Sequence, residues 1–316
     1  MQPERASLVS VVIATAFREA TLAKTLESLH DQTAVPGQIV IVDGAPAPGV
    51  APLVTALGAQ FGLNITYLRS SPPSAAVQRN VGVTAATGDV ILFLDDDVYL
   101  DADCVGKIVD VFDNDPDGRI GGVGVLIRNQ LCLPPSPFAK QWFDFLADER
   151  KDSYSGMVIG PAIAVGPEPT IDGRLVRAEW LMSTCAAYRR TALPPGPFES
   201  RFYGYSYMED VDLSVRVART HELVVDTGIY VFHDSQPSQF KSPRIRARMT
   251  VQNRYHVMTR TLGRRTIGHH LKFIASLIVP QLVSLREVNG LSKLRAWLQS
   301  LQGTIVGLCG IVWSPS

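Results

Sequence analysis

The stretch VILFLDDD, residues 90–97, carries most of the information about the fold. Its run of apolar residues is typical of a strand that is buried on both faces within a parallel sheet. The three aspartates that follow repel one another, so they suit a position where a divalent cation neutralises them. Mg²⁺ and Mn²⁺ prefer such oxygen ligands. The alternative is a solvated turn that caps a helix beginning near Asp101 or Asp103.

The segments before this stretch alternate between strand and helix patterns. Apolar runs rich in Val and Ile predict strands, and leucines at helical spacing predict the helices between them. This alternation predicts an α/β fold with a mostly parallel central sheet and helices on both faces. Ligands of such sheets bind beyond the carboxyl ends of the strands. The predicted elements are strand Leu8–Thr15, helix Glu19–Asp31, strand Ile39–Val42, helix Val50–Phe61, strand Ile65–Leu68, helix Ala75–Ala86 and strand Val90–Leu94.

The pattern after about Asp115 is less regular. Residues 131–137 are rich in proline and predict a loop, and residues 151–173, rich in Gly, Pro and Ser, predict a loop with weak strands. The remaining predicted elements are strand Gly121–Ile127, a strand-turn-strand unit over Glu179–Arg189, helix Met208–Thr220 and a short strand Ile229–Phe232.

The composition and the N-terminus indicate which partners and which location to expect. Lys plus Arg number 30, as do Asp plus Glu, so the chain has no formal net charge and nothing indicates a nucleic-acid partner. The four cysteines are scattered without the spacing of a zinc site, which predicts reduced thiols and a cytoplasmic location. The N-terminus lacks the charged stretch and apolar run of a signal peptide.

The C-terminal part has a different character. Residues 241–272 contain nine Lys or Arg and no Asp or Glu. Two apolar stretches follow, Phe273–Leu285 with Pro280 inside it and Leu301–Trp313 with three glycines. Each is shorter than the roughly 20 residues that a membrane-spanning helix needs. The predicted division is an α/β domain, residues 1–240, and a basic, apolar helical extension, residues 241–316.

This extension suits the surface of a membrane. Basic side chains are attracted to an anionic leaflet, and an apolar helix can lie in the interface without crossing it. We therefore expect peripheral contact with the inner face of the cell membrane. The alternative is that residues 273–285 pack on the first domain or form a homodimer contact.

Other polar residues extend the expected site. Asp43 follows the strand IVIV and suits a hydrogen bond to a base or ribose, although a simple D-G turn also explains it. Arg79 lies in the first turns of a predicted helix, where it suits a diphosphate; the alternative is a surface arginine. His233 follows the strand YVF and is either structural or, if it lies near the aspartates, a metal ligand.

One further segment is rich in acids. YSYMEDVDLSVR, residues 205–216, places Glu209, Asp210 and Asp212 within one helical turn. One of these carboxylates can serve as a general base. The helix dipole also favours acids at this end of a helix, and Asp212 is spaced to pair with Arg216.

Taken in order, these motifs resemble family 2 glycosyltransferases of the GT-A fold, a Rossmann-like nucleotide-sugar-binding domain. The resemblance covers about residues 8–235. It rests on VSVVIAT with Arg18 and Glu19, on IVIVDGA, on AAVQRNVGVTAATGDVILFLDDD, on EWLMSTCAAYRRTAL with Phe198 and Glu199, and on YMEDVDLSVR.

The resemblance implies a role for each site residue. On the donor side, Thr15, Arg18 and Asp43 would line the nucleotide, Arg79 would lie near the base or diphosphate, and Asp95 and Asp96 would face the donor. Asp97 would ligate the metal together with Asp95 and His233. Asp210 would be the catalytic base, with Trp180 and Glu209 on the acceptor side. The second strand ends in D-G-A, where the family more often has D-D or D-N-x-S.

The implied activity is inverting sugar transfer, assisted by Mg²⁺ or Mn²⁺. The donor would be a UDP-, GDP- or dTDP-sugar, and the acceptor a hydroxyl of a polysaccharide, glycolipid or lipid-linked glycan. One alternative is a non-catalytic protein that binds nucleotide-sugar or carbohydrate. A sugar nucleotidyltransferase would need a G-x-G-T-R loop where this chain has residues 14–18, ATAFR, and a dinucleotide-dependent oxidoreductase would need G-x-G-x-x-G.

Overall fold

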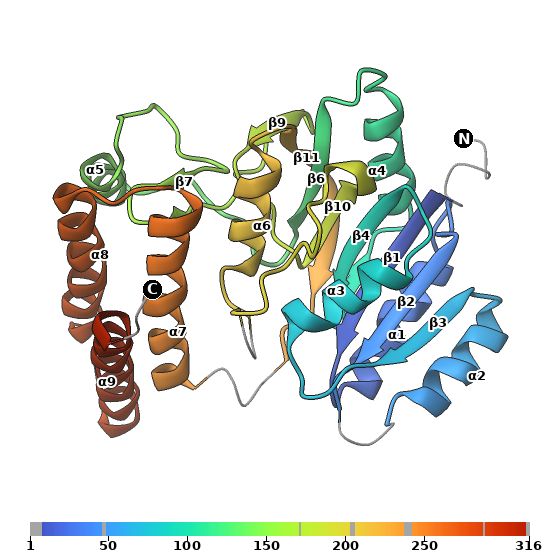
Figure 1. Cartoon of the computed structure of the whole chain (residues 1–316), viewed down its shortest axis with the longest axis horizontal. Coiled ribbons are helices and arrows are strands. Elements are labelled where there is room, and N and C mark those ends of the chain that lie inside the picture. Colours follow the sequence, from blue (N-terminus) through green and yellow to red (C-terminus); the bar gives the residue numbers. More distant parts are fainter. Residues whose placement is uncertain are drawn as a thin grey trace. The chain divides into compact units, whose positions relative to one another are not determined.

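The chain folds into two compact units (Figure 1). The computed structural model describes residues 8–45, 49–170, 172–202, 206–236, 242–286 and 288–313. The sheet unit comprises Met1–Leu133 and Gly166–Gln236, and the helical unit comprises Pro134–Val165 and Pro237–Ser316. The predicted boundary at residue 240 lies outside the described residues. Residues 134–165, which the sequence prediction placed in the first domain, pack instead with the C-terminal helices.

The first half of the sheet unit has the predicted alternation of strands and helices. Its four strands are parallel, and the register pairs Thr15 with Asp43 and Ala14 with Asp95, so their carboxyl ends meet at one edge. The predicted α/β fold is thereby confirmed. The elements are β1 (Val9–Thr15), α1 (Glu19–His30), β2 (Gln38–Asp43), α2 (Ala51–Phe61), β3 (Ile65–Arg69), α3 (Ala75–Ala85) and β4 (Val90–Asp95).

The second half extends the same sheet in mixed directions. The strand order is β3-β2-β1-β4-β10-β6-β11-β5, with β9 paired to β11. β10 is antiparallel to both β4 and β6, and β11 is parallel to β6, so β6 and β11 run in the direction of β4 again. The elements are β5 (Val98–Leu100), α4 (Cys104–Asp113), β6 (Ile120–Ile127), β9 (Leu175–Ala178), β10 (Cys185–Arg189), a 3₁₀ turn (Arg190–Ala192), α6 (Glu209–Val217) and β11 (Glu222–His233).

Two predictions for this half were inaccurate. The strand-turn-strand unit expected over residues 179–189 contains only β10, because β9 ends at Ala178. The short strand expected at residues 229–232 is the end of a 12-residue strand, β11. The first part of β11 pairs with β6 and β9, and its last residues pair with β5. These partners lie far away in the sequence, so local pattern could not reveal the full length of the strand.

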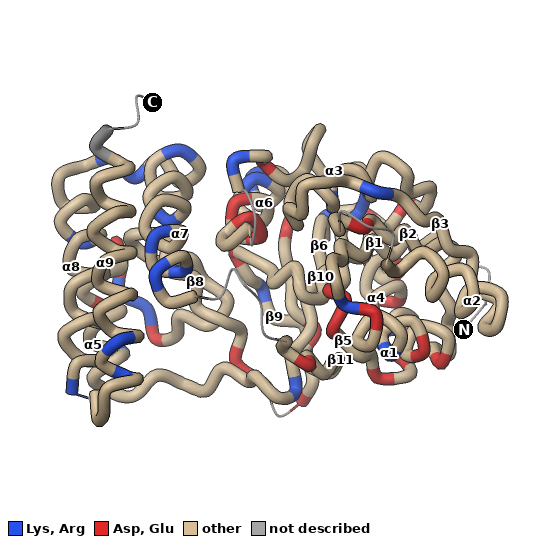
Figure 2. The backbone as a smooth tube through the Cα atoms, turned by 90° about the horizontal axis from the view of Figure 1, so that it is seen from below, with Lys and Arg blue, Asp and Glu red and all other residues tan. Residues whose placement is uncertain are grey.

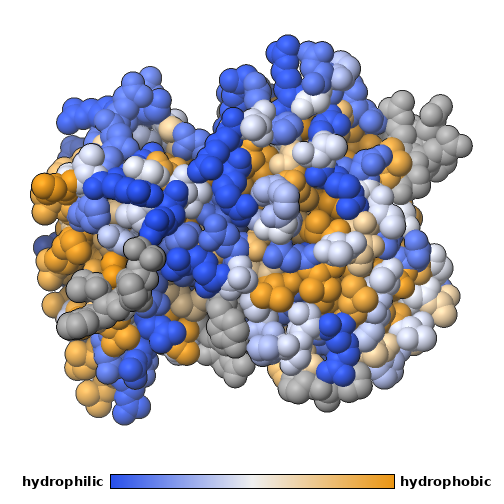
Figure 3. All heavy atoms as spheres, in the orientation of Figure 1, coloured by the Kyte–Doolittle hydropathy of each residue, from blue (hydrophilic) through white to orange (hydrophobic). Residues whose placement is uncertain are grey.

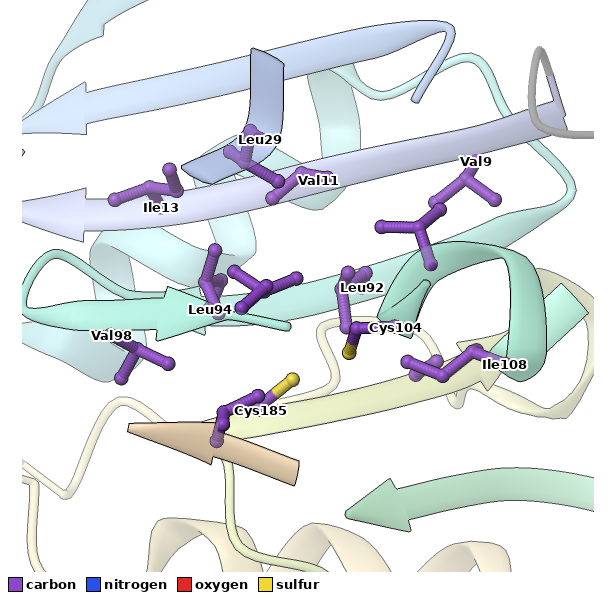
Figure 4. Close-up of a cluster of buried hydrophobic side chains, with 14 of the residues drawn as sticks. Val9, Val11, Ile13, Leu29, Leu92, Leu94, Val98, Cys104, Ile108 and Cys185 are labelled. Carbon is purple, nitrogen blue, oxygen red and sulfur yellow. The ribbon is translucent and has the colours of Figure 1, made fainter. Parts of the chain in front are cut away.

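The core of the sheet unit lies where the strands meet the covering helices (Figure 4). Ile13 and Leu94 are fully buried, as is Leu29 on α1. Burying each such side chain contributes about 1.5–3 kcal/mol. Cys104 and Cys185 also lie in this core, and all four cysteines of the chain are free thiols. Apolar packing, without disulfide bonds, therefore holds the strand ends in place.

The helical unit consists mainly of long helices. Ser136 accepts a hydrogen bond from the backbone of Ala139 and so caps α5, a helix that the sequence prediction missed. No helix in the described parts of the chain combines the length and apolarity that crossing a membrane requires. The elements are α5 (Pro137–Leu146), β7 (Val158–Ile159), β8 (Ile163–Ala164), α7 (Pro243–His256), a π-helical turn (Val257–Thr261), α8 (Ile267–Leu285) and α9 (Leu291–Trp313).

Glycines let α9 approach α7 closely. A Cβ atom at Gly303 would lie 2.2 Å from the carbonyl oxygen of Arg244, and one at Gly307 would lie 2.8 Å from the Cβ of Val251. Both distances are shorter than van der Waals contact, so a larger residue forces the two backbones apart. The glycines of the apolar stretch at residues 301–313 therefore serve helix packing.

We expect Gly303→Ala to destabilise the protein by about 1–3 kcal/mol, because the added methyl group meets backbone that has no room to move. Urea unfolding measures this change. Gly268→Ala is the matched control, since a Cβ there meets only the hydroxyl oxygen of Thr266, at 3.7 Å. Equal unfolding midpoints for the two variants would contradict the packing argument.

Candidate functional site

The polar residues singled out in the sequence gather at one edge of the sheet. β1, β2 and β4 end there together, since they are parallel and in register. β11 runs in the same direction, and its last residue, His233, pairs with Val98 directly after the aspartates at residues 95–97 (the aspartate triplet). The backbone N–H of Asp234 also donates to the carbonyl of Asp97, at 2.8 Å. The sheet topology thus brings His233 to the aspartate triplet.

Asp96 is enclosed rather than solvated. Asp96 is 4% exposed and Asp97 is 2% exposed, which excludes the alternative of a solvated acidic turn. Thr15 Oγ1 donates to one carboxylate oxygen of Asp96 at 2.6 Å, and Arg18 donates to the other at 2.9 Å. Burial raises the pKa of Asp96 to about 7, against the opposing effects of Arg18 and Thr15. Thr15, Arg18 and Asp96 therefore form one bonded cluster.

Asp97 differs from Asp96 in that its contacts favour the ionised form. Arg18 donates to it at 2.6 Å, and His233 Nε2 lies 3.1 Å from its other oxygen. Burial by itself would raise the pKa of Asp97. The hydrogen bond and charge of His233, together with Arg18, outweigh burial and hold that pKa below its usual value. A carboxylate that stays ionised is a suitable ligand for a cation.

A divalent cation fits between three of these residues. Asp95, Asp97 and His233 each offer one ligand atom, and these atoms lie within 4.8 Å of one another. Two carboxylate oxygens and one imidazole nitrogen suit Mn²⁺ or Mg²⁺. Asn129 exchanges two hydrogen bonds with the backbone of His233, and Gln130 lies 3.3 Å from its Nδ1 atom. The sequence prediction missed both residues, because they follow β6 and carry no recognisable motif.

Arg79 is buried between two carboxylates. It is 3% exposed, which excludes a surface arginine. One terminal nitrogen donates to Asp95 at 2.8 Å and the other donates to Glu209 at 2.7 Å. Its Nε atom has no hydrogen-bond partner among the described residues. The structure therefore links two residues that the sequence had placed on opposite sides of the site, the donor side for Asp95 and the acceptor side for Glu209.

The start of α6 presents Asp210 to the site. Ser206 and Met208 have positive φ angles of 58° and 76°. Such conformations cost non-glycine residues about 1–3 kcal/mol each and tend to occur at functional sites. Burial raises the pKa of Asp210 to about 6, against hydrogen bonds from the backbone of Val211 and Ser183 and the charge of Arg79.

Asp212, the third acid of this segment, has a structural role. It is fully buried, and Arg216 donates to it at 2.9 Å. The pairing expected from their spacing is therefore present. Trp180 is buried in the segment between β9 and β10. That segment lies against α6, because the backbone of Leu181 donates to Ser214 at 3.0 Å.

Asp43 lies at the far side of this edge and is fully buried. One of its oxygens accepts from the backbone of Ala45 at 2.8 Å, and the other accepts from the Tyr67 hydroxyl at 2.9 Å. Gln78 donates to the carbonyls of Thr15 and Val42, which fastens α3 to the ends of β1 and β2. The sequence prediction missed Tyr67 and Gln78, because their role is to bond to Asp43 and to the strand ends, and these contacts form only across the sheet.

The comparisons with known proteins concern mainly the first part of the sheet unit. Residues 10–131 match the family model described as Glycosyl transferase family 2. The chain is 37% identical over 91 residues to the uncharacterized glycosyltransferase YwdF of Bacillus subtilis, which is 29% of this chain and 33% of that one. It is 28% identical over 148 residues to a glucosyl-dolichyl phosphate glucuronosyltransferase of Haloferax volcanii, which is 45% of this chain and 46% of that one. The chain thus spans less than half the length of these curated relatives.

Two solved structures resemble the fold. A mannosyltransferase, PcManGT of Pyrobaculum calidifontis in complex with GDP-Man and Mn²⁺, has a TM-score of 0.55 at 14% identity, over 98% of this chain and 88% of that one. GalNAc-T7 with UDP, GalNAc and Mn²⁺ has a TM-score of 0.53 at 14% identity, over 85% and 54%. At this identity the likeness concerns the fold alone.

The segment 10–131 therefore belongs to glycosyl transferase family 2, as the sequence predicts, and the chain has a GT-A-like fold. The family model stops before the motifs at residues 179–193 and 207–216 that the resemblance also used.

We expect Arg79→Met to lower the free energy of unfolding by about 3–5 kcal/mol, because it leaves buried carboxylates without a counter-charge. The double variant Arg79→Met/Glu209→Gln should lose less than the sum of the two single changes. Urea unfolding of all four proteins measures the coupling. Lys107→Met is the control: its pair with Asp103 is exposed, at 43% and 49%, and contributes at most about 1 kcal/mol. Additive losses would refute the buried link.

Proposed function

We propose that this protein is an inverting glycosyltransferase that moves a sugar from a nucleoside diphosphate sugar to an acceptor hydroxyl. One observation carries the proposal. A cation-binding group, Asp95, Asp97 and His233, and a raised-pKa acid, Asp210, belong to one connected site, because Arg79 bonds to Asp95 and to Glu209 beside Asp210. The names of the similar proteins support it, since they include a glucuronosyltransferase and a mannosyltransferase with GDP-Man.

The donor would bind at the edge where β1, β2 and β4 end. Asp43 would contact the base or ribose, and Thr15 and Arg18 would hold Asp96 in place beside the diphosphate. The structures of similar fold contain GDP-Man or UDP, so the proposal covers a nucleoside diphosphate sugar without choosing the base. A divalent cation held by Asp95, Asp97 and His233 would supply positive charge for the diphosphate as it leaves.

The acceptor would bind beside Asp210, near Trp180. The carboxylate of Asp210 accepts the proton of the acceptor hydroxyl while that oxygen attacks the anomeric carbon. The bond from the anomeric carbon to the diphosphate breaks, and the nucleoside diphosphate leaves with the electron pair. Attack in line with the leaving group inverts the anomeric centre. The acceptor is a glycan or lipid-linked hydroxyl, as the name of the Haloferax relative suggests.

We expect Asp210→Asn to lower kcat at least about 100-fold, because an amide cannot accept the proton. Nucleotide binding, measured by calorimetry, should be unchanged. In the wild type, kcat/KM should fall as the pH drops below about 6, since protonation removes the base. The control is Asp103→Asn, which removes an acid at the start of α4 and should retain activity. Near wild-type turnover by Asp210→Asn would refute the assignment of Asp210 as the base. Absence of turnover by the wild type with every nucleotide-sugar would instead favour a non-catalytic binding protein.

We further expect Asp97→Ala and His233→Ala each to weaken Mn²⁺ binding roughly tenfold or more, because each removes a ligand. Calorimetry with Mn²⁺ alone measures the affinity without any turnover. His221→Ala is the matched control, since His221 precedes β11 and is bonded to Thr220 away from the triplet. Unchanged Mn²⁺ affinity in both ligand variants would mean that the cation site is elsewhere.

A further inference from the structure

The two units of the chain carry opposite charge. The helical unit contains 15 Lys and Arg against 5 Asp and Glu, whereas the sheet unit contains 15 against 25. The formal charges are therefore +10 and −10, which cancel in the whole chain. Figure 2 shows the contrast, with few acidic positions on α7, α8 and α9. A surface this basic attracts an anionic partner.

Helix α8 exposes a continuous apolar stripe. Its six members are spaced at i, i+4, i+7, i+11, i+15 and i+18, which places them on one face of the helix. Phe273 and Leu277, which lie off this stripe, are buried, at 2% and 8% exposed. Figure 3 shows hydrophobic side chains along the outer edge of α8. The stripe consists of Ile267 (81% exposed), Leu271 (66%), Ile274 (38%), Ile278 (51%), Leu282 (59%) and Leu285 (43%).

Helix α5 adds exposed aromatic residues next to the start of α8. Phe138 is 68% exposed and Phe145 is 54% exposed, and Trp142 stacks on Phe145 with ring centroids 5.3 Å apart. The end of α5 is fastened to α8, because Lys272 donates to the carbonyl of Ala147 at 2.6 Å. Asp148 also pairs with Arg264 and His269, each at 3.1 Å. These contacts therefore join the end of α5, with its exposed aromatic residues, to the first turns of α8.

We infer that α5 and α8 form a docking surface for an anionic lipid bilayer, with α8 lying along the interface. Apolar stripes flanked by Lys and Arg, with Trp and Phe beside them, are the features of helices that lie in the headgroup region. The same unit carries exposed basic residues, Arg286 directly after α8 and Lys293 and Arg295 on α9.

The charge argues against a second copy of the chain as the partner. A symmetric dimer through this face would place two units of formal charge +10 against each other. An anionic bilayer instead meets both the apolar stripe and the positive charge. The inference rests on the helical unit alone, so it holds or fails independently of the proposed transferase reaction.

Flotation of the full chain with lipid vesicles tests the inference. We expect the protein to float with vesicles of phosphatidylcholine and phosphatidylglycerol, to bind vesicles of phosphatidylcholine alone more weakly, and to be released partly by salt. Leu271→Glu/Ile278→Glu should weaken binding at least about tenfold, because it removes apolar surface and adds repulsion. Both side chains are exposed, so the unfolding midpoint should be unchanged.

The matched control is Val35→Glu/Leu175→Glu on the sheet unit. These side chains are 44% and 46% exposed, and the change in charge is the same. The control should float like the wild type. Absence of wild-type flotation, or equal flotation of the two double variants, would overturn the inference. So would a dimer in light scattering that Leu271→Glu/Ile278→Glu dissociates without any vesicle binding by the wild type.

Discussion

Two arginines hold together the acidic centre of the sheet unit. The aspartate triplet and Glu209 are largely withdrawn from water, and burying a carboxylate without a counter-charge costs several kcal/mol. Arg18 meets Asp96 and Asp97, and Arg79 meets Asp95 and Glu209. The position of α6 relative to the strand ends depends on the second of these contacts. A site with this many buried carboxylates is stable because the fold itself supplies the two arginine side chains that neutralise them.

The sheet topology explains how the site is completed. β10 enters antiparallel between β4 and β6, so the strands beyond it run again in the direction of β4. The end of β11 then lies at the same edge as the triplet, and pairing with β5 places His233 against Asp97. The imidazole of His233, about 135 residues after the triplet, thereby joins Asp95 and Asp97.

The helical unit, in contrast, depends on close packing of α7 and α9 and leaves one face of α8 exposed.

Local pattern was sufficient for the first half of the sheet unit. Runs such as VSVVIAT and VILFLD are apolar on both faces, and the helices between them have leucines at helical spacing, so each element is specified by its own residues. It was insufficient for β11 and β9, whose length and partners depend on strands far away in the chain. It also missed α5, because the proline-rich stretch before it reads as a loop although Ser136 and Pro137 begin a helix there.

The sequence by itself determined the likeness to glycosyl transferase family 2 over residues 10–131, the strand that ends in three aspartates, and several of the residues that gather around it. Those features reside in short ordered motifs, and parallel strands bring their carboxyl ends together without further information. Only the tertiary structure decided how the charges are paired. It assigned Arg18 to Asp96 and Asp97, and it placed Arg79 between Asp95 and Glu209. Pairing depends on burial and on distances across the fold, and neither is written in local sequence.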